Sequence, residues 1–252
     1  MMRTLALLVL GGLLVASGAH AEDAPVPVGP AVPGPWRASL SYTVQRGDFG
    51  TDTAQTLGEL DLGLRYRFAS GAVQVNLPYV RLQSRDSTGQ VVSTQGVGDA
   101  SVGARIRLSD QQRGMPALSA LGELKLPTAD EANGLGTGEP DLTAGLGLDA
   151  FVTANAFWFS DLSYTLVGQP PGASLRDRWR LALGAGGYLP GGLVLTASLE
   201  QRTAAYDGAT DARELLLGMA QGVTRGWQLA LSKGLSDGAP DFGATAGLYA
   251  TF

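Results

Sequence analysis

The chain has 252 residues, of which 44% are hydrophobic and 16% charged, and its net charge at pH 7 is −5. This acidic balance, with a charged share well below the roughly 25% of an average soluble domain, excludes the basic face that nucleic-acid binding requires. The sequence has no cysteine, which excludes disulfides, thiolate metal sites and a cysteine nucleophile.

The first 21 residues have the three-part pattern of a secretory signal peptide. Arg3 precedes an apolar run over residues 5–16, and Ala19-His20-Ala21 forms a small-residue cleavage site. A membrane anchor is disfavoured, because the apolar run is shorter than the ~20 residues that a spanning helix needs. We expect cleavage after Ala21, which removes the single histidine of the sequence. Residues 22–35 are rich in proline and predict an extended periplasmic linker.

From Trp36 onward, apolar and polar residues alternate, as in strands that have one apolar and one polar face. Over residues 36–45 every even position is apolar, and the same alternation holds over 59–68 and 99–108. The pattern predicts strands over residues 36–46, 57–69, 72–83, 97–108, 117–127, 140–151, 156–167, 177–188, 192–203, 212–223, 226–234 and 241–252.

Three of these segments depart from a clean alternation. In strand 72–83 the apolar residues move from odd to even positions at Pro78, and a bulge there would account for the change of phase. The alternation is weak over 117–127. Residues 213–220 also fit one or two turns of helix.

The connections between the predicted strands alternate in length. Short connections lie at 69–71, 152–155, 189–191 and 224–225, the connection 109–116 is longer, and long polar connections lie at 47–56, 84–96, 128–139, 168–176, 204–211 and 235–240. Short turns at one end and longer loops at the other are typical of outer-membrane barrels. An even number of strands places both ends of the barrel on one side, and the linker indicates that this side is the periplasm.

A soluble barrel or a β-sandwich would also alternate, but three features favour a membrane barrel. The polar face is rich in glycine, serine, threonine and paired charges, as a hydrated interior would be. The final strand ends on Phe252, and a terminal aromatic residue resembles the signal by which outer-membrane barrels are recognised for assembly. Aromatic residues near strand ends would form the interfacial girdles, namely Trp36, Phe68, Phe151, Trp158, Trp179, Tyr188, Trp227 and Phe242.

We therefore predict an all-β protein, a transmembrane antiparallel up-and-down β-barrel of about twelve strands over residues 36–252. Its location would be the bacterial outer membrane. Its partners would be outer-membrane lipid, the barrel-assembly machinery through the C-terminal strand, and a small-molecule solute, with no nucleic acid.

Several motifs in the central region resemble a known family. They are Leu77-Pro78-Tyr79, Gly98-Asp99, Gly103-Ala104-Arg105, the run 123–128 with Asp130, and the run 134–138 with Asp141. The sequence is similar to the outer-membrane phenol meta-pathway family of transporter-like barrels. The resemblance implies an outer-membrane barrel that moves small molecules, with aromatic compounds as the suspected class.

Candidate catalytic groups are few. Without histidine in the mature chain, a Ser–His or Asp–His mechanism is excluded. Serine–lysine catalysis would need Lys125 or Lys233, which we interpret instead as charges in the interior or at a strand end. Glu59 and Asp61 lie two residues apart on one strand face and fit a glycosidase pair, but arginines share that face, so a bracing charge network is favoured.

Two further motifs have structural interpretations that we favour over ligand binding. The glycine-rich run 134–138 lacks the following helix that phosphate loops use, so we predict a turn. Asp130, Glu131, Glu139 and Asp141 could gather Ca²⁺, but no loop spacing supports this and we interpret them as solvated acids. We expect neither a metal site nor a cofactor.

The interior of the predicted barrel indicates its function. Twelve strands fall between the filled eight-stranded barrels and the water-filled barrels of sixteen or more. Phe157 and Phe159 are the main inward aromatic candidates. Charged residues predicted to line the passage are Glu59, Asp61, Arg65, Arg67, Asp99, Arg105, Arg107, Glu123, Lys125, Asp141, Asp149, Arg178, Arg180, Glu200 and Arg202, with Asp161 facing them.

The favoured function is a passive channel or transporter for small molecules, aromatic or hydrophobic compounds among them. The alternative is a sealed barrel with a structural or surface-interaction role, motivated by the number of ion pairs that the inward charges could form. A barrel enzyme is the least favoured function.

Overall fold

The computed structural model describes residues 34–49, 53–85 and 89–252. The predicted signal peptide, residues 1–21, and all but the last two residues of the predicted linker 22–35 lie outside the described residues. Within the described ranges, no helix is long and apolar enough to cross a lipid bilayer.

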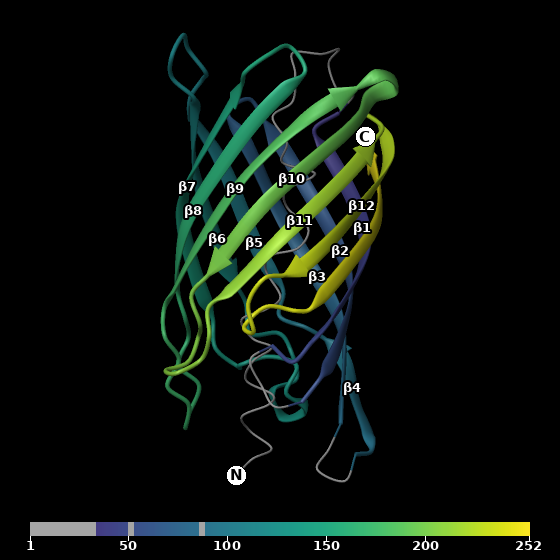
Figure 1. Ribbon diagram of the computed structural model, residues 1–252, viewed down its shortest axis with the longest axis vertical. Coiled ribbons are helices and arrows are strands. Elements are labelled where there is room, and N and C mark those ends of the chain that lie inside the picture. The colour runs from purple at the N-terminus through teal and green to yellow at the C-terminus, as the bar shows by residue number, and fades with distance from the viewer. Residues whose placement is uncertain (1–33, 50–52, 86–88) are drawn as a thin grey trace.

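In the described part of the chain, thirteen strands form one antiparallel sheet that closes into a barrel (Figure 1). The strands are β1 (Trp36–Gly47), β2 (Gln55–Phe68), β3 (Gly71–Arg85), β4 (Val91–Val97), β5 (Ser101–Ser109), β6 (Ala117–Lys125), β7 (Asp141–Phe151), β8 (Ala156–Leu166), β9 (Arg178–Leu189), β10 (Leu193–Arg202), β11 (Ala212–Gln221), β12 (Arg225–Gly234) and β13 (Phe242–Thr251), with short 3-10 turns η2 (Glu131–Asn133) and η3 (Pro190–Gly192). The pairing of β1 with β13 closes the barrel. All twelve predicted strands are confirmed, and the fold is an up-and-down barrel.

The two ends of the barrel differ as predicted. At the turn end, the short connections lie beside the C-terminus, where Trp36 and Phe252 exchange two backbone hydrogen bonds of 3.1 and 2.9 Å. At the loop end lie the long connections. In Figure 1 the C-terminus marks the turn end at the top, and the hairpin of β3 and β4 projects at the bottom.

The β3–β4 hairpin corrects the prediction that residues 84–96 form a loop. Strand β5 pairs with the first part of β3, residues 71–76, and β4 pairs with the last part, residues 79–85. Both strands lie along the same edge of β3, one after the other, so β4 takes no separate place in the barrel wall. Twelve strands make up the wall, and β4 is the thirteenth. Repeated β-branched residues in an uncharged segment are the signal for a strand that the loop interpretation missed.

A bulge lies beside Pro78, but it is not in β3. The pairing of β3 with β2 runs through Pro78 without a shift. On the other side, Asn76 pairs with Ser101 and Tyr79 pairs with Val97, so that two residues of β3 face the three residues 98–100. The extra residue therefore belongs to the facing segment, and the predicted change of phase in β3 is wrong.

The residues beyond Pro78 explain the misleading pattern. Val80 and Leu82 point into the barrel like the other even positions of β3, and both are buried. Near the loop end the interior is locally apolar, because Leu135 packs against these two residues and Leu57. The apolar even positions thus reflect a buried cluster and not a reversal of the strand's faces.

The helical alternative for residues 213–220 is also wrong. This segment lies in β11, which pairs with β10 on one side and β12 on the other. The consecutive leucines there resemble a helical pattern because Leu216 points inward while Leu215 and Leu217 point outward. The backbone hydrogen bonds of β11 to both β10 and β12 favour the strand over the helix that the local sequence also allows.

The outer surface of the barrel is apolar around its circumference. Exposed leucines, valines and aromatic residues occupy the outward positions of the wall strands, as in Leu60, Leu62 and Leu64 of β2. Exposed apolar residues on this scale are unfavourable in water but fit the hydrocarbon core of a bilayer. A closed barrel also satisfies its backbone hydrogen bonds without water, which lipid requires.

Aromatic residues fill part of the interior near the turn end. Phe157 and Phe159 are inward and buried, with 1% and 6% of their surfaces exposed. Phe151 and Tyr188 pack against Phe157, with ring centroids 5.9 and 5.5 Å away. Phe151 and Tyr188 therefore belong to an interior cluster, which corrects their assignment to the interfacial girdle.

The rings of this cluster lie over glycines on the neighbouring strand. Phe159 pairs with Gly184 and Phe157 with Gly186 in the register of β8 and β9. A Cβ built at Gly186 would lie 2.5 Å from the Phe157 ring, and one at Gly184 would overlap the Phe159 ring. The absence of side chains at these two positions therefore lets the rings lie flat against the wall.

Gly184→Val is expected to lower the free energy of unfolding by about 1–3 kcal/mol, because overpacking displaces the Phe159 ring. The temperature at which the folded band is lost on a denaturing gel would measure the change. Gly103→Ala is the matched control, since its nearest neighbouring atom is 3.7 Å from an added Cβ. Equal melting temperatures for the two variants would contradict the proposed packing.

Candidate functional site: the interior of the barrel

The fifteen charged residues predicted to line a passage all lie on the interior side of the wall or at its loop end. The alternation of the strands and their register place them there, and nine of them take part in interior ion pairs. The other six form no ion pair with a described residue, and of these Arg65 and Arg178 have other partners: Glu59, Asp61, Arg65, Arg67, Glu123 and Arg178.

The structure adds two interior charges that the prediction omits. Arg37 lies at the turn end, where its Nε donates to Thr251 Oγ1 at 3.3 Å and its guanidinium lies 4.5 Å from the centre of the Tyr249 ring. Glu214 of β11 accepts a hydrogen bond from Arg202. Arg37 occupies a polar position of the alternating pattern, so that pattern could have identified it, whereas Glu214 lies in the strand with the ambiguous pattern.

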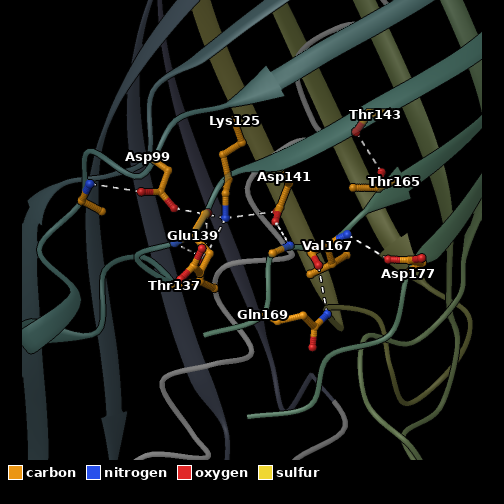
Figure 2. A network of polar contacts seen from close by, with 12 residues as sticks. Asp99, Lys125, Thr137, Glu139, Asp141, Thr143, Thr165, Val167, Gln169 and Asp177 are labelled. Carbon is orange, nitrogen blue, oxygen red and sulfur yellow. Dashed lines mark hydrogen bonds and ion pairs between the residues drawn. The ribbon is translucent and has the colours of Figure 1, made fainter. Parts of the chain in front are cut away.

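A buried lysine joins three segments at the loop end (Figure 2). Lys125 Nζ lies 3.0 Å from Asp141 Oδ2 and 3.3 Å from Asp99 Oδ2, and it donates to Thr137 Oγ1 at 3.0 Å. Only 3% of the Lys125 surface is exposed. One cation thus connects the end of β6, the start of β7, the segment before β5 and the loop 126–140.

The loop 126–140 folds back onto the barrel. Leu135, 1% exposed, packs against Leu57, Val80 and Leu82. The backbone N–H of Ala129 donates to Asp99 Oδ1 at 3.0 Å. An apolar contact inside the barrel and polar contacts at its rim therefore hold the loop across part of the loop end.

The glycine-rich run 134–138 is a turn, as predicted. Gly134 and Gly138 have positive φ angles of 68° and 72°, and β7 follows, so no helix is available to hold a phosphate. Asp130 caps η2 by accepting from the backbone N–H of Asn133 at 3.3 Å. Among the described residues, no group of three or more His, Cys, Asp or Glu side chains could hold a metal ion.

An ionic ladder crosses β9, β10 and β11. Arg180 Nη2 lies 2.7 Å from Glu200 Oε2, and Arg202 Nε lies 3.2 Å from Glu200 Oε1. Arg202 also contacts Glu214 through Nη2. Charges on three adjacent strands thus compensate one another, which buried charges require.

Two further pairs extend this wall toward β5. Arg105 reaches Asp161 of β8 with both terminal nitrogens, at 3.2 and 3.4 Å, and Arg107 lies 3.5 Å from Asp149. Gly147 makes the first pair possible, because a Cβ there would lie 2.5 Å from Arg105 Nη2. The charged wall therefore extends from β5 to β11.

The opposite part of the interior, from β12 through β13 and β1 to β2, carries mainly hydroxyl and amide groups. Thr43 and Thr245 share a hydrogen bond of 2.9 Å across β1 and β13. Side chains of the neighbouring strand lie over the glycines of this wall, Ser232 over Gly243 and Gln228 over Gly247. Its acidic groups are Glu59 and Asp61, so the two sides of the interior differ in character.

Polar contacts hold the loop 167–177, which joins β8 to β9 (Figure 2). Asp177 accepts from the backbone N–H of Val167 at 3.0 Å and from the Tyr164 hydroxyl at 2.8 Å. These hydrogen bonds favour the carboxylate and hold the pKa of Asp177 below its ordinary value. Gln169 bonds to the backbone of Val167 and Leu175.

Residues 44–252 match the protein-family model described as "Putative MetA-pathway of phenol degradation". The chain belongs to this family. The resemblance that the motifs of residues 77–141 indicated is therefore confirmed. None of the curated proteins matches the sequence.

The barrel is also similar to solved structures of channels. An outer-membrane channel from Pseudomonas putida F1 aligns with a TM-score of 0.74 at 16% identity, covering 92% of this chain and 100% of that one. The KdgM porin aligns at 0.58 and 9% identity, covering 85% and 99% of the two chains. The CymD monoaromatic hydrocarbon channel aligns at 0.50 and 10% identity, covering 87% and 89%. At these identities the similarity establishes the fold.

Proposed function

We propose that this protein is an outer-membrane channel through which small molecules pass without an energy source. The observation that carries the proposal is the division of the closed barrel into an apolar exterior and an interior lined by charged, hydroxyl and amide groups. The exterior suits lipid and the interior suits water and polar solutes. The fifteen charged residues predicted from the sequence would line this passage.

The loop end would face the cell exterior and the turn end the periplasm. This orientation is supported by the short connections beside the C-terminus, which are typical of the periplasmic side of such barrels. Phe252, exposed at the end of the final strand, would be the contact for the barrel-assembly machinery. Outer-membrane lipid would surround the apolar exterior.

Aromatic or hydrophobic compounds are the proposed solutes, and the family description and the name of the CymD channel support this class. Inside the barrel, Phe151 and Tyr188 form the partly exposed side of the aromatic cluster. Their rings offer a surface on which a flat apolar solute could stack. The polar wall opposite would accommodate the water that accompanies it.

An enzymatic role is not proposed. The similar structures named above are channels and porins, and the sequence offers no histidine after the predicted cleavage site to act as a general base. A sealed barrel is the second candidate, favoured by the ion pairs and by Leu135, which occupies part of the interior at the loop end.

Conductance in a planar lipid bilayer tests the proposal. The purified barrel is expected to produce reproducible current steps, and a triple variant with alanine at Arg65, Arg105 and Arg180 is expected to raise their size at least about twofold, because three large side chains leave the passage. A triple variant of the exposed outward residues Arg46, Arg81 and Arg225 is the control. A folded protein that never conducts would support the sealed barrel instead.

A further inference from the structure

The acidic groups of β2 differ from most of the other interior acids in their surroundings. Asp149, Asp161, Glu200 and Glu214 each contact an arginine. Among the described residues, no hydrogen bond or ion pair joins Glu59 or Asp61 to a neighbour. The two carboxylates lie two residues apart on one face, about 7 Å along the strand, so their charges repel without a cation between them.

The strand register places uncharged polar groups beside these carboxylates. Asp61 pairs with Ser41, Ser41 with Gly247, and Gly247 with Gln228. A Cβ built at Gly247 would lie 3.0 Å from both Gln228 Nε2 and Ser41 Cβ. The Gln228 side chain therefore extends over Gly247 toward Ser41 and the acids beyond it.

The side chain of Gln228 has a buried oxygen that a ligand could satisfy, which is a second observation in favour of a binding site. Its side chain is 7% exposed, and its Oε1 is buried with no hydrogen-bond partner among the described residues. A buried acceptor without a donor costs about 1–3 kcal/mol in ordinary cases. A molecule that brings N–H donors into this row would remove that cost.

We propose that Glu59, Asp61, Ser41 and Gln228 form a binding site for an organic cation that bears primary ammonium groups. The site contains two carboxylates, a carbonyl oxygen and a hydroxyl, which are acceptors suited to the donors of an ammonium group. A single metal ion is disfavoured, because the row spans four strands and its oxygens cannot converge within the 2.3–2.6 Å of a calcium shell. The inference deepens the proposed function by adding cationic solutes to those that the channel admits.

Binding of 1,4-diaminobutane to the detergent-solubilised protein, measured by isothermal titration calorimetry, tests the site. The double variant Glu59→Gln, Asp61→Asn is expected to weaken binding at least about tenfold, the effect of losing one charge-assisted hydrogen bond. Gln228→Leu is expected to weaken it severalfold. Asp110→Asn, which removes an exposed acid in the connection between β5 and β6, is the matched control and is expected to leave binding unchanged.

The neutral diol 1,4-butanediol has the same chain length and separates charge recognition from simple occupancy. Binding of the diamine but not the diol, lost in the double variant, supports the site. Absent binding to the unaltered protein, or equal binding by the double variant, overturns it. Bilayer currents separate the two proposals: a protein that conducts but binds no diamine refutes the site alone, and one that binds diamine without conducting refutes the channel alone.

Discussion

Lys125→Ala is expected to lower the free energy of unfolding by about 3–5 kcal/mol, because removing one partner leaves buried charges uncompensated. The ammonium group lies between Asp99 and Asp141, and both carboxylates are buried. The loop 126–140 would also lose the hydrogen bond from Lys125 to Thr137. Thermal unfolding of the refolded barrel in detergent, followed by circular dichroism, measures the change.

The other lysine of the sequence is the matched control. Lys233 lies at an exposed, outward position of β12, and Lys233→Ala is expected to change stability by less than about 0.5 kcal/mol. If both variants melted at the temperature of the unaltered protein, the buried ion pairs would have no role in holding the loop end together.

Leu135→Ser is expected to release the loop 126–140 from the interior and to raise the single-channel conductance. Packing of a buried leucine side chain stabilises a protein by about 2–5 kcal/mol. Serine lacks that packing and brings a hydroxyl into the apolar cluster of Leu57, Val80 and Leu82. Limited proteolysis of the loop would report its release, and bilayer currents would report the wider passage.

Leu235 offers a control of the same residue type in another connection at the loop end. It is 55% exposed, so Leu235→Ser is expected to change neither the conductance nor the rate of cleavage within 126–140. An unchanged conductance in Leu135→Ser, together with faster cleavage of the loop, would place the narrowest part of the passage elsewhere.

The two sides of the interior suggest different contributions to selectivity. On the wall from β5 to β11 most of the charges form ion pairs, so they brace the barrel and add little net field. On β2 the acids have no described partner, whereas Arg37, Arg65 and Arg67 gather toward the turn end. Solutes crossing the barrel would therefore meet an acidic region and a basic region at different depths.

The sequence by itself determined the strands and their two faces. Alternation with a period of two depends on each residue's own polarity, so the apolar exterior and the inward placement of residues such as Arg105 and Glu200 could be predicted without knowledge of the pairing. The turn at 134–138 was likewise predictable, because glycine and proline impose local backbone geometry.

Only the tertiary structure decided which inward groups meet. Phe151 and Tyr188 lie at strand ends, as girdle residues do, but the register of β7, β8 and β9 brings them together around Phe157. The ion pairs of Lys125 with Asp99 and Asp141 depend on the pairing of β6 with β5 and β7. The packing of Leu135 against Val80 depends on the loop 126–140 folding back into the barrel. The pairing of strands and the folding back of a loop depend on contacts between different segments of the chain. The polarity pattern along one segment therefore does not specify them.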